Sequence, residues 1–415
     1  MNEKYTLQCL TTKDLVDDNY TLHYTDGALL RTIYHNDLTV NHGRNGMMKF
    51  HDWMPNYEIS DLDVGTQTYQ AEALGKAIGM NNLWVTFHGY WPEKNGLCPT
   101  GSFKDMEAVP TLIRLKEKNC DGLICASAGN TARAFAYFCG LYNVPIIIIV
   151  SHLHAKRLYV PDGHPTDSVK LIVLEDGDYY DAKVFSKKLA KHLDNWQMEG
   201  SVHNVARRDG IGSLILDAAF TIGAMPQHYF QGIGGGPGPI GVHEMAVRAI
   251  DAGFFDGPPP RQHVSQNVEH SPIHNAWQAN RNHLIKADFP DEEVTVYSDY
   301  LLNKSPAYDV KGGVHDILKQ SNGQTYVVEK EAAVAAKELF EQTEGIDIMT
   351  PGGVALASLI QALEVGEINS DDCTVLNISG GGVERMKSEV KCSTITPWMT
   401  IAKSAEVGEI IDLLE

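Results

Sequence analysis

Short isoleucine-rich segments that alternate with helical periodicity constrain the fold of this chain more than any other feature. Residues 121–126 and 145–151 are apolar and bounded by turn residues, as is typical of strands buried on both faces. Residues 131–142 between them have helical spacing, and a strand at 170–174 followed by a helix at 181–193 repeats the pattern. This order predicts a parallel sheet with right-handed crossovers.

A second set of alternating segments begins near Gly210. We expect helices at residues 211–222, 242–252, 331–342 and 353–364, with strands at 229–233 and 374–378. Residues 254–269 contain prolines, histidines and glutamines without periodicity, and we expect a loop there. In a chain of 415 residues, the two sets predict an α/β fold of two doubly wound domains.

Charge and cysteine content argue against several classes of function. A formal net charge of -19 disfavours a nucleic-acid or anionic-membrane partner, because either needs a basic surface. The seven cysteines show neither even pairing nor Cys-x-x-Cys spacing, so we expect no disulfide framework and no metal site. We find no basic leader and no apolar window of membrane length, and expect a cytoplasmic protein.

A lysine at the opening of a predicted helix is the leading catalytic candidate. Lys104 lies in the sequence Thr-Gly-Ser-Phe-Lys-Asp at residues 100–105, and apolar residues recur at helical spacing around it. A lysine amine can hold an aldehyde cofactor as a Schiff base, so the motif favours pyridoxal 5'-phosphate chemistry. The alternative is an ordinary solvated lysine in the first turn of a helix.

A small-residue turn follows the strand predicted at residues 121–126. Its sequence is Ser127-Ala128-Gly129-Asn130-Thr131, and a helix opens there. Backbone amides at a helix N-terminus favour an anion, so the turn suits a substrate carboxylate. The alternative is that Ser127 or Asn130 only caps the helix.

A glycine-rich turn covers residues 232–240, which read Gly-Ile-Gly-Gly-Gly-Pro-Gly-Pro-Ile. It also joins a predicted strand to a helix, where α/β folds bind phosphate with backbone amides. Pro237 and Pro239 have no N–H, so only part of the turn can bind phosphate, and a purely structural turn is the alternative. A dinucleotide site fits less well, because Gly-x-Gly-x-x-Gly is met only loosely and no acidic residue is clearly placed on a following strand.

Ser379 ends the last predicted strand, before Gly380, Gly381 and Gly382. A serine that faces a pyridine nitrogen leaves the ring largely unprotonated, whereas a carboxylate would keep it protonated. The neutral ring is a weaker electron sink, which favours elimination and replacement at Cβ over transamination. An ordinary turn residue at a strand end is the alternative.

These motifs, in this order, resemble the threonine synthase branch of fold-type II pyridoxal phosphate enzymes, with a tryptophan synthase β-like fold. Within that branch the chain is more closely similar to the cysteate synthase family. The likeness rests on Phe-His-Asp-Trp-Met-Pro at 50–55, Gly-Tyr-Trp-Pro-Glu-Lys at 89–94, Asn-Val-Ala-Arg-Arg at 204–208, His-Asn-Ala-Trp-Gln at 274–278 and Glu-Gly-Ile-Asp-Ile at 344–348.

Two positions depart from the threonine synthase pattern. Met106 stands where those enzymes usually have an arginine, so a cation expected near the site is missing. Cys9 is followed by Leu10, so the N-terminal cysteine pair of that branch, and its metal site, are expected to be absent.

The resemblance implies a role for each candidate residue. Lys104 would form the Schiff base and act as the catalytic base, Asn130 would bond the phenolic oxygen of pyridoxal phosphate, and Ser379 would face its pyridine nitrogen. The cofactor phosphate would be held by Gly234, Gly235, Gly236 and Gly238. The substrate carboxylate would be held by Ser127, Ala128, Gly129 and Thr131. Arg133 is the first candidate for a second substrate contact, with Arg207 and Arg208 next, and a surface salt bridge is the alternative for each.

The resemblance also implies a reaction and a domain arrangement. We expect β-replacement on O-phospho-L-serine, with sulfite as the nucleophile, giving L-cysteate and phosphate. The alternatives are threonine synthesis from O-phospho-L-homoserine and water, β-replacement with another small nucleophile, and a catalytically silent relative that binds an amino acid. We expect a homodimer, with residues 1–95 plus 211–415 forming a large cofactor-binding domain and residues 96–210 a smaller mobile substrate domain.

Overall fold

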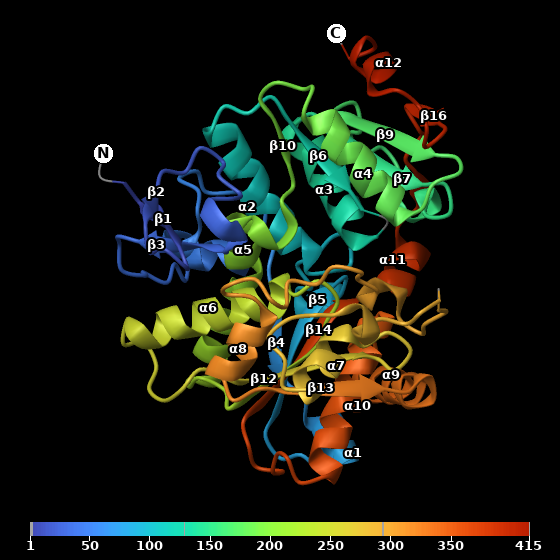
Figure 1. The fold of residues 1–415 in the computed structure, drawn as a ribbon. Coiled ribbons are helices and arrows are strands. Elements are labelled where there is room, and N and C mark those ends of the chain that lie inside the picture. Colours follow the sequence, from blue (N-terminus) through green and yellow to red (C-terminus); the bar gives the residue numbers. More distant parts are fainter. Residues whose placement is uncertain (1–2, 128, 293, 415) are drawn as a thin grey trace.

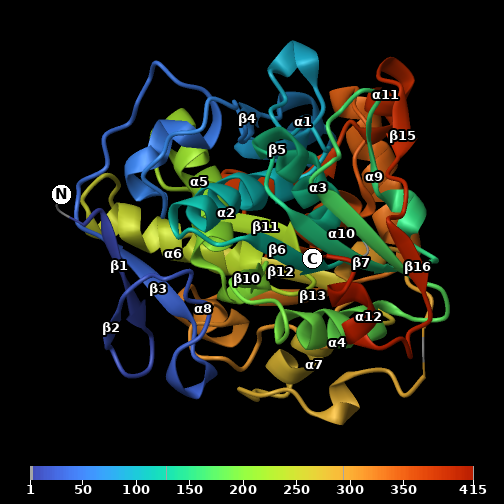
Figure 2. The ribbon, with the colours of Figure 1, turned by 90° about the horizontal axis from the view of Figure 1, so that it is seen from above.

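The computed structural model describes residues 3–127, 129–292 and 294–414. Two helix-covered sheets lie one above the other, with the N-terminal strands to one side (Figure 1). The C-terminal segment lies against the upper sheet, as the view from above also shows (Figure 2). Within the described residues, no helix has the length and apolar character needed to cross a membrane.

The smaller, upper sheet has parallel strands in the order β10, β6, β7, β9, β16. Their bounds are β6 Gly122–Ala126, β7 Ile146–Ser151, β9 Val169–Leu174, β10 Trp196–Met198 and β16 Met399–Ile401. Within β7, Ile146 and Ile148 pack on the side of α3 (Asn130–Tyr142), whereas Ile147 and Ile149 pack on the side of α4 (Tyr179–Ala190). The isoleucine-rich strands are therefore buried on both faces, as the sequence predicted.

The larger, lower sheet has the strand order β13, β12, β11, β14, β5, β4, and only its edge strand β4 is antiparallel to its neighbour. The bounds are β4 Gln67–Gln70, β5 Leu83–Gly89, β11 His228–Gly232, β12 Arg261–Asn267, β13 Gln324–Val328 and β14 Thr374–Gly381. One face packs on α9 (Lys330–Glu344) and α10 (Thr350–Glu364), and the other on α5 (Val205–Ile222) and α6 (Pro237–Asp251).

The remaining elements surround these sheets. An antiparallel N-terminal sheet has β1 (Tyr5–Cys9) between β2 (Leu15–Val16) and β3 (Leu30–Tyr34), and β8 (Tyr159–Pro161) pairs with β15 (Cys392–Thr394). The other α-helices are α1 Glu72–Ile78, α2 Lys104–Glu117, α7 Pro272–Gln278, α8 Val314–Gln320, α11 Val383–Glu389 and α12 Val407–Ile411. The 3-10 helices are η1 Thr25–Gly27, η2 Gly46–Trp53, η3 Pro92–Lys94, η4 Ala155–Arg157, η5 Ser201–His203, η6 Lys286–Asp288 and η7 Asp299–Leu301.

The predicted α/β fold is confirmed, and two of the predicted helices, α5 and α6, begin a turn or more earlier than expected. The helix α5 begins at Val205 rather than 211, because Arg207, Arg208 and Asp209 are buried and paired although charged residues usually lie at the surface. The helix α6 begins at Pro237 rather than 242, since a proline is well accommodated at the first position of a helix.

The loop predicted at residues 254–269 is wrong in its second half, where β12 lies inside the larger sheet. The strand was missed because its buried side chains are polar. His263 bonds His228 and Tyr326 at 3.0 and 2.9 Å, and Gln266 accepts from Ile273 N at 3.0 Å. Side-chain partners thus satisfy groups that would otherwise be costly to bury.

The predicted domain boundary differs from the sheet pairing at the C-terminus. We assigned residues 211–415 to the larger unit, yet β16 pairs with β9 of the smaller sheet. Met399 and Ile401 pack there with the residues around α4, so apolar burial holds this returning segment to the smaller sheet. The mobility of the smaller unit stays a prediction.

Candidate active site

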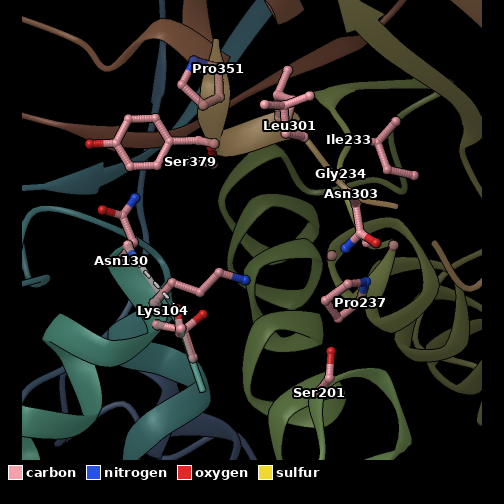
Figure 3. A pocket seen from close by; sticks show the side chains of 18 of the residues that line it. Lys104, Asn130, Ser201, Ile233, Gly234, Pro237, Leu301, Asn303, Pro351 and Ser379 are labelled. Carbon is pink, nitrogen blue, oxygen red and sulfur yellow. Dashed lines mark hydrogen bonds between the residues drawn. The ribbon is translucent and has the colours of Figure 1, made fainter. Parts of the chain in front are cut away.

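The carboxyl ends of β6, β11 and β14 meet at a cavity of about 310 Å³. Lys104 extends into it from the start of α2 (Figure 3). Asn130 and Ser379 lie on one side of the lysine, and Gly234 and Asn303 lie on the other. Convergence of strand ends is where α/β folds bind ligands.

The turn before Lys104 is fastened to the end of β14. Gly101 has a φ of +79°, which a glycine adopts without steric strain. Its carbonyl accepts from Gly381 N at 3.1 Å, and Phe103 N donates to Ser379 O at 3.0 Å. One hydrogen-bonded unit therefore positions both Lys104 and Ser379.

Lys104 opens a chain of alternating buried charges. Its Nζ donates to Glu107, which is fully buried one turn along α2. Glu107 also accepts from Arg207 Nε at 2.5 Å, and Arg207 pairs in turn with Glu199. Burial lowers the pKa of Lys104, the charge of Glu107 opposes that shift, and Arg207 adds to it. A lowered pKa raises the share of neutral amine, the form that can attack an aldehyde or accept a proton.

The predicted carboxylate turn lies at the cavity. Ser127, Gly129, Asn130 and Thr131 line it, whereas Ala128 lies outside the described residues. Among described groups, no side chain caps α3, so the capping alternative for Ser127 or Asn130 is not observed. The first amides of this 13-residue helix are left for a ligand or water.

Arg133 does not line the cavity, contrary to our first choice for a substrate cation. It is 4% exposed and donates to Tyr159 Oη at 2.8 Å, to Thr100 O at 2.6 Å and to Asn130 Oδ1 at 3.2 Å. Because it lies one turn along α3, its guanidinium reaches back to hold the Asn130 amide and the turn at Thr100. The structure therefore gives it a supporting position.

Two other arginines do line the cavity. Arg207, our next candidate, is one of them, whereas Arg208 pairs with Glu244 at 3.0 Å beneath the site. The second is Arg157, which the sequence did not single out. Arg157 pairs with Asp299 at 2.5 Å and is about one-third exposed. Its donors are the more accessible of the two, because Arg207 is 3% exposed between two carboxylates.

The glycine-rich turn fits a phosphate. Within the part of the chain described here, no intramolecular acceptor takes the amides of Gly234, Gly235, Gly236 or Gly238. The turn has no room for side chains, since a Cβ at Gly235 would lie 2.9 Å from Asn303 Nδ2 and one at Gly236 would lie 2.7 Å from Val314. Free amides at the N-terminus of α6 form an anion cradle that a Cβ would fill.

Two further polar groups at the cavity lack strong partners. The Ser379 hydroxyl makes no hydrogen bond with any described residue, and Asn130 Nδ2 reaches only Met349 Sδ, at 3.4 Å. A lysine amine, an amide donor, a hydroxyl and a phosphate cradle match the aldehyde, the phenolic oxygen, the pyridine nitrogen and the phosphate of pyridoxal phosphate. The donor set therefore fits this cofactor.

Sequence reasoning missed several residues of the site. Glu107 could have been found, because position i+3 from Lys104 lies on the same helix face. The other missed residues come from segments far apart in the chain, and no spacing in the sequence indicates them. They are Arg157, Glu199, Gln231 and Asn303.

The comparisons with known proteins agree with this geometry. The family "Pyridoxal-phosphate dependent enzyme" matches residues 59–380. The cysteate synthase of Methanocella paludicola is 40% identical over 403 residues, which cover 96% of this chain and 94% of that protein. That of Methanocella arvoryzae is 42% identical over 403 residues and 96% of each chain. The chain belongs to the cysteate synthase family.

Membership of the cysteate synthase family makes the chain a pyridoxal-phosphate dependent enzyme, as the motifs predicted. Solved structures show the same fold at low identity. Maize serine racemase has a TM-score of 0.57 at 16% identity and covers 78% of this chain and 92% of its own. A pyridoxal 5'-phosphate-dependent aspartate racemase has a TM-score of 0.58 at 12% identity, with 77% and 90% coverage. The predicted fold-type II class is thus confirmed.

Proposed function

We propose that this enzyme carries out β-replacement on O-phospho-L-serine, with sulfite as the nucleophile, and releases L-cysteate and phosphate. The observation that carries the proposal is the meeting of Lys104, the carboxylate turn and the glycine cradle in one cavity of a cysteate synthase family member. Pyridoxal phosphate supplies an aldehyde for the amino group of the substrate and a ring that withdraws electrons from Cα.

We assign the predicted cofactor contacts to the residues that line the cavity. Lys104 Nζ would bond the aldehyde carbon, Asn130 Nδ2 would donate to the phenolic oxygen, and the hydroxyl of Ser379 would face the pyridine nitrogen. The four free amides of the glycine turn would donate to the phosphate. Except for Lys104, which pairs with Glu107, each of these groups lacks a strong partner within the described residues.

Lys104 would carry the proton of Cα. Its Nζ is the amine that extends into the cavity, and burial lowers its pKa toward the range where it can take up and return a proton. Glu107 holds the protonated amine by an ion pair, which keeps the proton at Nζ until Cα takes it back. The replacement needs no net proton from this pair, because the proton taken from Cα returns there.

The two anions of the reaction need separate binding groups. Ser127, Gly129 and Thr131 around the start of α3 suit the carboxylate. Arg157, the more accessible of the two cavity arginines, suits the phosphate leaving group or the incoming sulfite.

Product analysis tests the proposal. The cofactor-loaded enzyme is incubated with O-phospho-L-serine and sulfite, and with sulfide, ammonia or water in place of sulfite. We expect cysteate by mass and one phosphate per turnover, and none from Lys104→Ala, which should also lose the absorbance band of the bound cofactor. Turnover of O-phospho-L-homoserine, but not of O-phospho-L-serine, would instead identify a threonine synthase.

Two further predictions, on assembly and location, belong to the same proposal. We infer a homodimer from the resemblance to the family, and a cytoplasmic enzyme, in keeping with the acidic composition and the absence of a membrane-spanning helix among the described residues. Sedimentation at micromolar concentration would test the first, since a single species of one-chain mass contradicts it. Fractionation of cells that express the chain would test the second.

A further inference from the structure

The phosphate cradle is short of donors at the start of α6. This helix begins at Pro237 and has Pro239 as its third residue, so two of its first three positions carry no N–H. Helix N-termini normally offer those amides to an anion. A phosphate ester with two negative charges therefore needs donors from elsewhere in the chain.

Gln231, next to the end of β11, faces this gap. It is 3% exposed and lines the cavity. Its Oε1 accepts from Tyr229 Oη at 2.6 Å and from Asn377 Nδ2 at 3.0 Å, which fixes the orientation of the amide. The Nε2 group is thereby turned to Gly238, where an added Cβ would collide with it. Within the described residues, Nε2 has no acceptor, so it is available to a group bound in the cavity.

Asn303 approaches the same turn from the opposite side. Its Oδ1 accepts from Ser305 N at 2.8 Å, so the amide orientation is again fixed. Its Nδ2 would lie 2.9 Å from a Cβ at Gly235 and donates to no group in the described part of the chain. Figure 3 shows this side chain beside Pro237, across the cavity from Lys104.

We propose that Gln231 Nε2 and Asn303 Nδ2 are side-chain donors to the cofactor phosphate, in place of the amides that Pro237 and Pro239 lack. The two groups flank the free amides of the turn, one at Gly238 and one at Gly235. Both are neutral, and the groups that fix them, on Tyr229, Asn377 and Ser305, do not line the cavity. They select the phosphorylated form of the cofactor.

Cofactor titration of the cofactor-free protein tests this assignment. Asn303→Ala and Asn303→Asp are compared with wild type for affinity to pyridoxal 5'-phosphate and to pyridoxal, by absorbance and fluorescence. A hydrogen bond to a charged group contributes enough that we expect at least about tenfold weaker binding of the phosphate form, and a larger loss for the aspartate. Affinity for pyridoxal should not change, because it has no phosphate to contact.

The matched control is Asn282→Asp, which makes the same change at an exposed residue. Gln231→Glu should weaken binding of the phosphate form in the same way as Asn303→Asp. If Gln231→Glu does not fold, because its amide is part of a buried network, the variants of the half-buried Asn303 still test the assignment. The shift of the bound phosphate in ³¹P spectra should also move. Unchanged affinity for the phosphate form, or an equal loss for pyridoxal, would overturn the assignment. Phosphate-selective loss without any cysteate synthesis would leave it intact and refute only the proposed reaction.

Discussion

Replacement of Glu107 by glutamine is the sharpest test of the buried charge chain. Glu107 is fully buried and is shared by Lys104 and Arg207. The variant keeps the shape but removes the negative charge that lies between two cations. Breaking a buried ion pair by removal of one partner costs roughly 3–5 kcal/mol. Glutamine still offers one acceptor, so we expect the lower end, about 3 kcal/mol.

Urea unfolding of the cofactor-free protein measures this loss, with the slope of the transition compared between variants. The control is Glu331→Gln, which removes the same charge from an exposed position on α9 and should change stability by no more than about 0.5 kcal/mol. If Glu107→Gln unfolds at the same urea concentration as this control, the charge chain does not stabilise the site as argued.

Glu107→Gln should also change Lys104 itself. Glu107 is the group that raises the pKa of Lys104 against burial, so its loss should lower that pKa further. Labelling of amines in the cofactor-free protein, mapped by mass, should then reach half its maximum at Lys104 at a lower pH than in wild type. A half-point that moves to higher pH contradicts the sign of the argument.

Three further perturbations follow from the structure. Arg157→Gln should raise the KM for one of the two anionic substrates about tenfold without a change in unfolding midpoint, because this arginine is partly exposed and faces the cavity; unchanged KM values for both would remove it from the site. Gly210→Ala should destabilise by about 1–3 kcal/mol, since its Cβ would collide with Met106 O, whereas Gly408→Ala meets nothing within 4 Å and should be neutral. Burial lowers the pKa of His88 to about 4, whereas a histidine in the unfolded chain has a pKa near 6.5. Between these two values the unfolded chain binds a proton at His88 and the folded chain does not, so the free energy of unfolding falls as the pH drops through that window. In His88→Asn, the number of protons taken up on unfolding between pH 6.5 and 4 should fall by about one, as measured by the slope of the unfolding free energy against pH. A slope equal to that of wild type would contradict this.

The sequence predicted the elements whose side chains follow the rule of apolar inside and polar outside. β6, β7 and β9 are apolar on both faces and were located within one residue or so. β12 breaks the rule with buried glutamine, histidine and asparagine, and it was mistaken for a loop. Its burial depends on partners in β11, β13 and the segment at Ser298, which only the folded chain brings together.

The residues of the candidate site also fall into those that the sequence could predict and those that it could not. Turns that can bind a ligand through backbone amides need glycine or small residues at strand ends. The cavity-lining residues 127, 129–131 and 234–238 could therefore be predicted from the sequence. Arginines and lysines that bind a ligand through long side chains need no particular residue type or spacing around them in the sequence. Arg133 has the right spacing from Asn130, but it bonds Thr100 O and the Asn130 side chain and does not line the cavity. Arg157 reaches the cavity from the 3-10 helix η4, which carries no motif.

The hydrogen bonds around the lysine turn also decide which parts can move together. Phe103 N and Gly101 O are bonded to Ser379 and Gly381 of the larger sheet, although we placed residues 96–210 in the mobile unit. If the smaller sheet moves as predicted, these bonds would keep Lys104 with Ser379, and the hinge would lie beyond the lysine. Closure would carry the turn at residues 127–131 and Arg157 toward a fixed lysine and cofactor cradle. Such an arrangement would keep the proposed bond between Lys104 and the cofactor unstrained, while the groups proposed to bind the substrate carboxylate and the second anion opened and closed around it.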